Sequence, residues 1–406
     1  MTLTPAISRR NFFSLLWHAG FLAFAQNFMD VDTIIPAMMV DAGGTAVHIG
    51  ILTAIMLGGS SVTQLFFAPF ISNFSYKKRF LLMGINSRII ALLLMGILLY
   101  YSVQLRGDHK ILMIFLLITI FSLGGAFANV SYTDIMGKSL DEGSRKPFFS
   151  IRQVVIGLIL FGSAFLARYL LGSADYPMNY SYMFFVGFIA LSIASLGFWN
   201  LKEVVPSKLV VRGPKHFLQI IGVELKQNRR LLYFLGFINT MGISITLLPF
   251  IILYAKSNFG LESTGTGNYL LFKVMGGVLT GLLLFAFSGK YKYRLLLYLV
   301  GVLALTIPLI VIIFPGISSF HLVFFLGGII FAAYSISMNG VLLEVSGTSN
   351  RTLYTGIAGA GNILPALFPL GAGWMIKQFG FLPYFILFMV VIISSFYFIY
   401  RLRCEK

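Results

Sequence analysis

The sequence predicts an all-α membrane protein with many spans, and three observations support this prediction. Only 11% of the 406 residues are charged and 58% are apolar, whereas an average soluble chain carries about 25% charged residues. The mean hydropathy is +0.89. Apolar stretches recur along the whole chain, each about 20 residues long, which is the length a helix needs to cross the hydrocarbon core. These properties exclude an ordinary soluble domain.

Twelve membrane-spanning helices are predicted, in two groups of six. Their bounds were placed where charged residues, Pro and Gly, or polar clusters interrupt the apolar pattern. The first six are expected at 11–40, 47–71, 80–103, 111–137, 149–172 and 181–200, and the second six at 230–255, 266–288, 295–315, 320–345, 353–377 and 381–400.

The basic residues predict the orientation of these helices. Lys and Arg number 30 against 13 Asp and Glu, an excess of 17. Most of them fall in alternate loops, beginning with Arg9 and Arg10, while the loops between carry few, chiefly Arg106, Lys110 and Lys256. Because Lys and Arg collect in cytoplasmic loops, both termini are expected to be cytoplasmic in a multi-pass protein of the cytoplasmic (inner) membrane. The excess charge therefore reports topology, and nucleic acid is not an expected partner.

An export signal is the alternative interpretation of the N-terminus. The segment Ser8–Phe13 contains two arginines and resembles a twin-arginine signal, and Ala23 and Ala25 offer a small-residue cleavage site. Cleavage there would leave eleven spans and disturb the repeat described next. The simpler interpretation is that the two arginines hold the start of the first helix in the cytoplasm.

A basic linker divides the chain into two related halves. It covers 201–228 and separates an N-terminal half, 1–200, from a C-terminal half, 229–406. Four features recur in corresponding order: Phe121–Gly125 with Phe324–Gly328, Tyr76–Arg79 with Tyr291–Arg294, Gly58 and Gly59 with Gly276 and Gly277, and Arg145 with Arg351. Repeated halves are typical of secondary transporters, which bind substrate between them near the midplane.

This arrangement resembles the major facilitator superfamily over essentially the whole chain. The family typically carries G-x-x-x-D-R-x-G-R-R between spans two and three, and here Asn73–Lys78 stands where D-R-x-G-R-R would fall. Asn73 replaces the Asp and Tyr76 replaces the second Gly, so the latch that the Asp makes in the family is not expected. Span one also resembles the first helices of the family, because an acidic residue precedes an apolar run and Pro36. A second resemblance is the segment Ser131–Asp134 in span four.

Three charged residues are predicted within the hydrocarbon region, where charges are costly and usually functional. They are Asp30, Asp32 and Lys273, candidates for proton or ion coupling or for substrate binding. In a continuous helix, positions two apart point about 200° apart, so only one of the two carboxylates would face the central path. Asp30 is favoured, with an interhelical hydrogen bond as its alternative role. Lys273 is expected to pair with Asp30 or an anionic substrate, unless it extends outward to the lipid surface.

The resemblance implies further site residues. Spans one, four, seven and ten line the path in the family, and their polar side chains can bind substrate or a neighbouring helix: Gln26, Asn27, Asn129, Tyr132, Asn239, Thr240, Tyr334 and Asn339. Pairs between Asp134 and Arg152 and between Glu344 and Arg351 are expected to support a gate, as is Arg145. The family analogy places Arg88 in a span outside the cavity. His18 is interpreted as an interfacial anchor, with a proton relay near neutral pH as its alternative role.

These features predict a secondary active transporter that moves a small molecule by alternating access, coupled to a proton or ion gradient. The chain lacks a Walker loop, an H-E-x-x-H motif and a Cys pair, so neither enzymatic activity nor a cofactor or metal is expected. We expect it to function as a monomer in the bilayer. Its 41 Phe and 16 Met favour export of an amphipathic compound over uptake of a solute. A non-transporting receptor or assembly factor of the same fold, and a membrane-embedded lipid transferase, remain alternatives.

Overall fold

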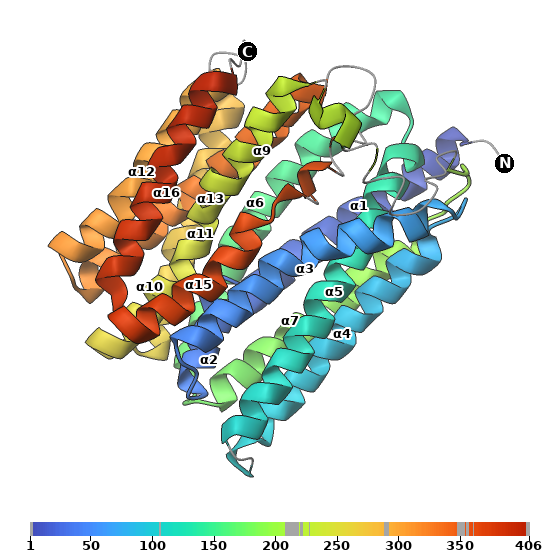
Figure 1. Ribbon diagram of the computed structural model, residues 1–406. Helices are drawn as coiled ribbons and strands as arrows, with labels where there is room; N and C mark the ends of the chain where they lie inside the picture. The colour runs from blue at the N-terminus through green and yellow to red at the C-terminus, as the bar shows by residue number, and fades with distance from the viewer. Residues whose placement is uncertain are drawn as a thin grey trace. The chain divides into compact units, whose positions relative to one another are not determined.

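The computed structural model describes residues 3–104, 107–207, 219, 222–226, 228–287, 292–346, 354, 357–359 and 361–402, with only the backbone described at 60–66, 68, 69, 72, 142, 146 and 343. Every regular element within these residues is a helix (Figure 1). The predicted fold class is therefore confirmed.

The chain forms two compact units that do not follow the order of the sequence. Unit 1 contains Met1–Asp30 and Val62–Leu218, and unit 2 contains Val31–Ser61 and Gln219–Lys406. A segment from the beginning of the chain thus packs with its C-terminal part. The predicted division into two repeated halves, 1–200 and 229–406, joined by a linker at 201–228, is a different division and stays a prediction.

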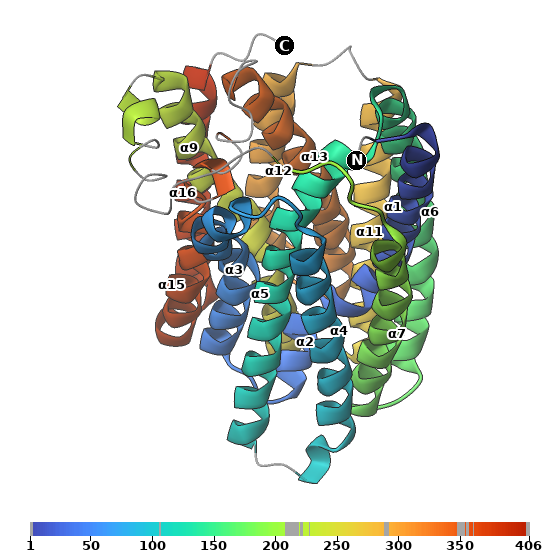
Figure 2. The same ribbon diagram turned by 90° about the vertical axis from the view of Figure 1, so that its right-hand side faces the viewer.

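Unit 1 is built from long helices that pack in pairs. Its elements are α1 (Pro5–Gln26), the 3-10 turn η1 (Asn27–Met29), α4 (Lys78–Tyr100), η2 (Ser102–Gln104), α5 (Gly107–Ser139), α6 (Glu142–Gly172) and α7 (Met178–Asn200). Helix α4 packs against α5 and α7, and α1 packs against α6 and α7. Figure 2 shows α4 and α5 running side by side.

Unit 2 begins with the short helix α2. Its elements are α2 (Ile34–Asp41), α9 (Arg229–Met241), η3 (Gly242–Thr246), α10 (Leu247–Phe259), α11 (Ser263–Ala286), α12 (Tyr293–Ile313), α13 (Ile317–Ser346), α15 (Leu364–Phe379) and α16 (Phe381–Leu402). Helix α2 packs against α10 and α11, and α13 packs against α11 and α12. Helix α3 (Ala46–Ser72) crosses the boundary between the two units at Ser61.

Several helices begin where a polar side chain accepts a free backbone N–H group. The Oγ1 atom of Thr4 accepts the N–H of Ile7, with Pro5 in the first helical position. The side chain of Asn228 accepts the N–H of Leu231 at 3.2 Å. Such caps replace the hydrogen bonds that the first turn of a helix lacks, and so they define where α1 and α9 begin.

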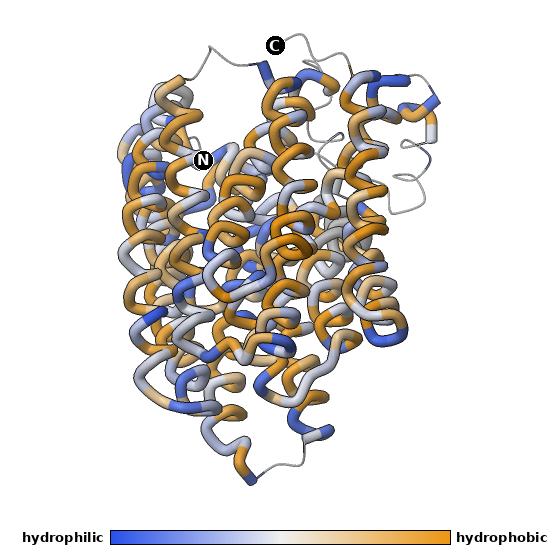
Figure 3. The backbone as a smooth tube through the Cα atoms, turned by 90° about the vertical axis from the view of Figure 1, so that its left-hand side faces the viewer, coloured by the Kyte–Doolittle hydropathy of each residue, from blue (hydrophilic) through white to orange (hydrophobic). Residues whose placement is uncertain are grey.

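Nine helices of the described residues are long and apolar enough to cross a membrane. They include the combined stretch Arg229–Phe259, which contains α9, η3 and α10. The other three predicted spans correspond to α1 with α2, to α3 and to the 16-residue α15. Apolar colouring dominates the helices, and hydrophilic residues are most frequent near their ends (Figure 3). These helices confirm that the protein is a polytopic membrane protein. The number of spans, twelve, stays a prediction.

Close helix packing depends on glycines that the sequence repeats in both halves. A Cβ atom added at Gly328 of α13 would lie 1.9 Å from the carbonyl oxygen of Lys273 in α11, and one at Gly276 would lie 2.1 Å from that of Phe325. In unit 1, a Cβ at Gly124 of α5 would lie 2.9 Å from the carbonyl oxygen of Gly84 in α4. Backbones approach this closely only where side chains are absent, so these glycines bring α11 to α13 and α4 to α5.

Candidate functional site

The first predicted span is interrupted at residues 30–33. Helix α1 ends at Gln26, η1 follows, Asp30 has an extended backbone with φ −63° and ψ 127°, and α2 begins at Ile34. A continuous helix would place Pro36 against the carbonyl of Asp32, four residues earlier. In the structure Pro36 instead occupies the first turn of α2, where proline is tolerated. The premise of one continuous helix from 11 to 40, from which we placed the two carboxylates about 200° apart, was therefore wrong.

Asp32 forms an ion pair with Lys273 within unit 2. The Nζ atom of Lys273 lies 2.5 Å from Oδ2 of Asp32, and both side chains are only 11% exposed. The same ammonium group lies 5.9 Å from the ring centroid of Phe331. Asp30 is half-buried at the end of η1, and its predicted pair with Lys273 stays a prediction. Because the span is interrupted, the side chain of Asp32 points in a direction that helical periodicity could not predict.

A second ion pair holds the other end of α2. The Nζ atom of Lys256, in α10, lies 2.8 Å from Oδ1 and 2.9 Å from Oδ2 of Asp41. Their side chains are 6% and 21% exposed, respectively. The Lys256 ammonium also donates to the carbonyl of Leu261 at 3.3 Å. Helix α2 is thus joined to α11 near its first turn and to α10 at its last residue.

The seventh predicted span is interrupted in a corresponding way. The turn η3 separates α9 from α10, and Pro249 is the third residue of α10, as Pro36 is of α2. The sequences Thr33–Pro36 and Thr246–Pro249 share the pattern T-x-x-P with two apolar residues between. This repeat could have predicted both breaks. In the second half the residue that corresponds to Asp32 is Ile245, so only the first break carries an acidic residue there.

Polar atoms without hydrogen-bond partners gather near η3. Within the described part of unit 2, the buried oxygens of Ser244, Ser337 and Asn362 accept or donate no hydrogen bond. Beside η3, a Cβ at Gly242 would lie 3.1 Å from the Tyr334 hydroxyl and 3.3 Å from Oδ1 of Asn362. Asn362 lies within the predicted span 353–377 and was not among the predicted site residues.

The predicted path residues differ in their burial and in the hydrogen bonds that they form with neighbouring helices. Asn27 donates to the Leu160 carbonyl at 2.6 Å and to Ser163 at 2.8 Å, and it is buried. Asn239 donates to the Gly361 carbonyl at 2.7 Å and accepts the N–H of Leu364 at 2.8 Å. The remaining residues are placed as follows: Thr240 donates within α9, Tyr334 is buried, Tyr132 is half-buried, and Gln26, Asn129 and Asn339 are exposed. The contacts of Asn27 and Asn239 support helix packing, the alternative role considered for this group.

Two arginines of unit 1 lack acidic partners among the described residues. The guanidinium of Arg88, in α4, lies over the ring of Phe121, 4.2 Å from its centroid, and its buried Nε atom has no hydrogen-bond partner. Arg152, in α6, lies close to the Tyr132 hydroxyl, and its buried Nε atom also has no hydrogen-bond partner. Both arginines are close enough to act electrostatically on His18. His18 is buried, is stacked on Phe198 and contacts the Ala194 carbonyl, so its interpretation as an interfacial anchor was wrong.

The predicted pair between Asp134 and Arg152 is replaced by other contacts. Asp134 lies 3.0 Å from Nζ of Lys77 and 2.9 Å from Nζ of Lys138. Tyr132 and Asp134 are two residues apart in α5, so their side chains point about 200° apart. Arg152 lies on the side of Tyr132, which explains why a different set of cations binds Asp134.

The other predicted gate residues are only partly described. Arg145 donates to the carbonyls of Leu140 and Gly137, at 3.3 and 2.9 Å, and so binds the end of α5. Glu344 lies 3.8 Å from Arg230. Arg351 lies outside the described residues, and its predicted pair with Glu344 stays a prediction.

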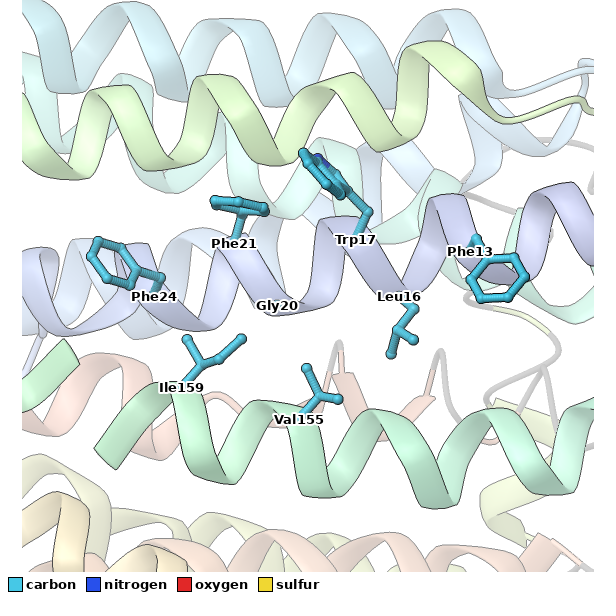
Figure 4. Close-up of a pocket in the computed structure, with 8 residues that line it drawn as sticks. All are labelled: Phe13, Leu16, Trp17, Gly20, Phe21, Phe24, Val155 and Ile159. Atoms are coloured by element: carbon cyan, nitrogen blue, oxygen red, sulfur yellow. The ribbon is translucent and has the colours of Figure 1, made fainter. Parts of the chain in front are cut away.

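An apolar groove runs between α1 and α6 (Figure 4). Its volume is about 400 Å³, and it is lined by Phe13, Leu16, Trp17, Gly20, Phe21, Phe24, Val155 and Ile159. Figure 4 shows Val155 and Ile159 pointing from α6 toward α1. Among the described residues no group of three or more His, Cys, Asp or Glu side chains is placed to hold a metal ion.

The fold and the two interrupted spans define a polytopic membrane protein with a transporter fold, and comparison with known proteins identifies the family. The family model described as Major Facilitator Superfamily matches residues 16–357. The chain belongs to the major facilitator superfamily. None of the curated proteins compared with the chain matches it.

Solved transporter structures share this fold at low sequence identity. A POT family transporter in complex with a thioalcohol conjugated peptide has a TM-score of 0.70 and 14% identity, covering 98% of this chain and 97% of its own. A mutant of the nucleoside transporter NupG has a TM-score of 0.68 and 13% identity, covering 98% and 100%. A D-xylose-proton symporter has a TM-score of 0.68 and 12% identity, covering 95% and 96%. These similarities confirm the fold.

Proposed function

We propose that this protein is a secondary active transporter that moves a small amphipathic molecule by alternating access, with proton movement coupled through Asp32. The observation that carries the proposal is the ion pair between Asp32 and Lys273, at an interrupted span. Interrupted helices mark substrate and ion sites in many transporter folds. The D-xylose-proton symporter of similar fold is named for proton coupling, which is consistent with this mechanism.

Protonation of Asp32 changes the contacts of α2. The ionised carboxylate binds the Lys273 ammonium, and both groups are almost fully removed from solvent. A buried ion pair is stable only while both charges are present, because loss of one partner leaves the other uncompensated. A proton on Asp32 therefore removes this ion pair and weakens the attachment of α2 to α11. Substrate binding and this protonation both bias the equilibrium between two conformations.

The remaining features of the proposal follow from the family and the sequence. Both termini are placed on the cytoplasmic side of the inner membrane, because the basic loops alternate along the chain. The protein functions as a monomer and requires no cofactor. Export is the proposed direction, and the apolar groove between α1 and α6 supports an amphipathic substrate.

Proton flux in reconstituted vesicles tests the function. Nucleosides, peptides, pentoses and amphipathic anions are first screened for thermal stabilisation of the purified protein, since a ligand of the folded state raises its stability. The stabilising ligand is then placed inside or outside vesicles that carry a pH gradient. Ligand-dependent proton flux is expected, and binding without flux would instead identify a receptor.

Matched substitutions test the role of Asp32. In Asp32→Asn and Lys273→Ala we expect ligand binding to persist and proton-coupled flux to fall at least about tenfold, a loss of about 1.4 kcal/mol. Asp41→Asn is the control, because it alters the other ion pair of the same helix. If Asp32→Asn and Lys273→Ala both keep proton-coupled flux and Asp30→Asn loses it, the proton-coupling residue is Asp30 and not Asp32.

A further inference from the structure

The groove between α1 and α6 is lined only by apolar and aromatic residues. The side chains of Phe13 and Trp17 in this lining are 57% and 47% exposed, and the indole N–H of Trp17 donates to the Ile193 carbonyl at 2.8 Å. Binding sites for polar solutes carry a few free polar groups, and none lines this groove. His18 of α1 is buried and, two residues before Gly20, points about 160° away from the groove. The groove therefore opens toward the hydrocarbon of the bilayer.

The groove is long and narrow. It follows α1 from Phe13 to Phe24, a length of about 16 Å along the helix axis. Its middle is open because Gly20 has no side chain: an added Cβ would lie 3.2 Å from Cδ1 of Ile159 and 3.6 Å from Cγ1 of Val155. Figure 4 shows these two side chains pointing from α6 toward α1. An apolar channel of this form, parallel to a spanning helix, suits an extended acyl chain.

Two adjacent arginines precede the groove in α1, and they make different contacts. The guanidinium of Arg10 donates to the carbonyl of Asn200 at 3.0 Å and to its Oδ1 at 2.6 Å, which joins α1 to α7. Arg9 is exposed, and no hydrogen bond or ion pair with another described residue holds its guanidinium. The carboxylate of Asp141, at the same end of α1, accepts hydrogen bonds from Ser8 and Ser144. Arg9 is therefore a positive charge that the packing of unit 1 does not use.

Arg9 lies on the face of α1 that lines the groove. Leu16 and Gly20 follow it by 7 and 11 residues in one continuous helix, so they lie within about 20° of it around the helix axis. Phe13, at the end of the groove, follows Arg9 by four residues and lies directly beside it on this face. Arg9 is thus about 6 Å beyond the end of the groove along the axis, toward the N-terminus.

We propose that the groove binds an acyl chain of an anionic phospholipid, and that Arg9 binds the headgroup phosphate of the same lipid. The N-terminus is placed on the cytoplasmic side, where the leaflet carries anionic lipids that attract basic residues. Arginine binds phosphate through planar, charge-assisted hydrogen bonds, and burial of the chain in the groove adds to the affinity. This inference goes beyond the proposed function, because the lipid is not transported; an amphipathic substrate that enters the groove displaces it.

Fluorescence quenching by brominated lipids tests the proposal without a substrate or an ion gradient. Trp199 and Trp374 are replaced by Phe, which leaves Trp17 in the groove as the only tryptophan. The protein is reconstituted into mixed vesicles of phosphatidylglycerol and phosphatidylcholine, in which one lipid or the other carries dibrominated acyl chains. Bromine quenches only a fluorophore that it contacts, so quenching measures which lipid lies beside Trp17. We expect phosphatidylglycerol to be preferred about fivefold, as one arginine near the membrane surface contributes.

Substitution of Arg9 locates the headgroup. Arg9→Gln is expected to abolish the preference for phosphatidylglycerol and to leave quenching by phosphatidylcholine unchanged, since the side chain is exposed and its loss does not disturb packing. Arg9→Lys keeps the charge without the planar geometry, so it should retain part of the preference. Arg168→Gln is the matched control, because Arg168 is an exposed arginine of α6, the other helix of the groove.

Filling the groove locates the acyl chain. A leucine at Gly20 must extend into the groove, because its Cβ already contacts Ile159. Gly20→Leu is therefore expected to weaken the quenching of Trp17 by both brominated lipids. Gly162→Leu in α6 is the control, since nothing lies within 4 Å of a Cβ added there.

Three results would overturn the proposal. The first is equal quenching of Trp17 by the two brominated lipids in the protein with Arg9, which would show ordinary contact with the bilayer only. The second is an undiminished preference for phosphatidylglycerol in Arg9→Gln. The third is equal quenching in Gly20→Leu and Gly162→Leu, which would place the acyl chain outside the groove.

Discussion

The carboxylate of Glu203 accepts the backbone N–H of Lys77 through both of its oxygens, at 2.8 and 2.9 Å. It also accepts the N–H of Lys78 at 2.7 Å and lies 2.8 Å from the ammonium of Lys138. Glu203 follows the last helix of unit 1, yet it supplies the acceptor at the start of α4. It thus provides an acidic residue in the same region where Asn73 replaces the family's Asp.

Replacing Glu203 by Ala should lower the thermal stability of the protein. The first turn of α4 would lose its acceptor, and Lys138 would lose one of its carboxylate partners. The side chain of Glu203 is 3% exposed, so we expect a loss of about 1–3 kcal/mol. The measurement is the midpoint of thermal unfolding in detergent. Asp108→Ala, at an exposed position in the first turn of α5, is the control, and an equal shift in both variants would contradict this role.

The pair between Asp41 and Lys256 should contribute to stability rather than to coupling. Asp41→Ala leaves the Lys256 ammonium, in a side chain that is 6% exposed, without its carboxylate, and losing one member of a buried pair costs about 3–5 kcal/mol. Unfolding in a denaturant series measures this loss. The exchanged variant, Asp41→Lys with Lys256→Asp, should recover part of the stability. No recovery would show that the loss comes from packing rather than charge.

Stability in acid should depend on Asp141, which lies between α5 and α6. Hydrogen bonds from Ser8 and Ser144 hold the pKa of its carboxyl below the usual value. Because the pKa is lower in the folded state, the ionised carboxylate stabilises the fold above the pKa of the unfolded chain. This contribution is lost as the pH falls through the lowered pKa of the folded state.

The comparison of Asp141→Ala with the parent protein checks this prediction. Thermal midpoints are measured from pH 7 down to about pH 3, a range that includes the ordinary pKa of Asp. The parent should be more stable at neutral pH, and the difference should shrink as the solution becomes acidic. A difference that does not change with pH would show that the hydrogen bonds of Asp141 do not depend on its charge.

A methyl group at Gly328 should disturb the packing of α13 on α11. The added Cβ would lie 1.9 Å from the carbonyl oxygen of Lys273, and overpacking of this kind costs about 1–3 kcal/mol. Because the displaced backbone carries Lys273, Gly328→Ala should also reduce proton-coupled flux. Gly371→Ala is the control, since nothing lies within 4 Å of its added Cβ. Equal stability and flux in the two variants would contradict the close approach.

The fold was predictable because each helix carries its own signal. A stretch such as 295–315 is apolar over its whole length, so a spanning helix follows from its length and composition without knowledge of its neighbours. The glycine pairs were predictive for a similar reason, since close packing requires small residues on both helices. Gly276 and Gly328 lie at the contact between α11 and α13.

The site was less predictable because it depends on departures from regular structure. We derived the directions of Asp30 and Asp32 from helical periodicity, and the interruption at 30–33 changes both. The paired T-x-x-P sequences, with Pro36 and Pro249, were the signal that could have located it. The partners of Lys273 and Asp134 depend on which residues from distant helices meet, and this information is not contained in the pattern of any one span.

The interruption at 30–33 separates α2 from the helix that precedes it in the first span. Asp30 ends the first segment of unit 1 and Val31 is the first residue of unit 2, so the chain passes from one unit to the other inside its first span and returns within α3. Within unit 2, α2 is joined to α10 and α11 by the ion pairs of Asp41 and Asp32, so a segment from the beginning of the chain is held by residues that follow it by more than 200 positions.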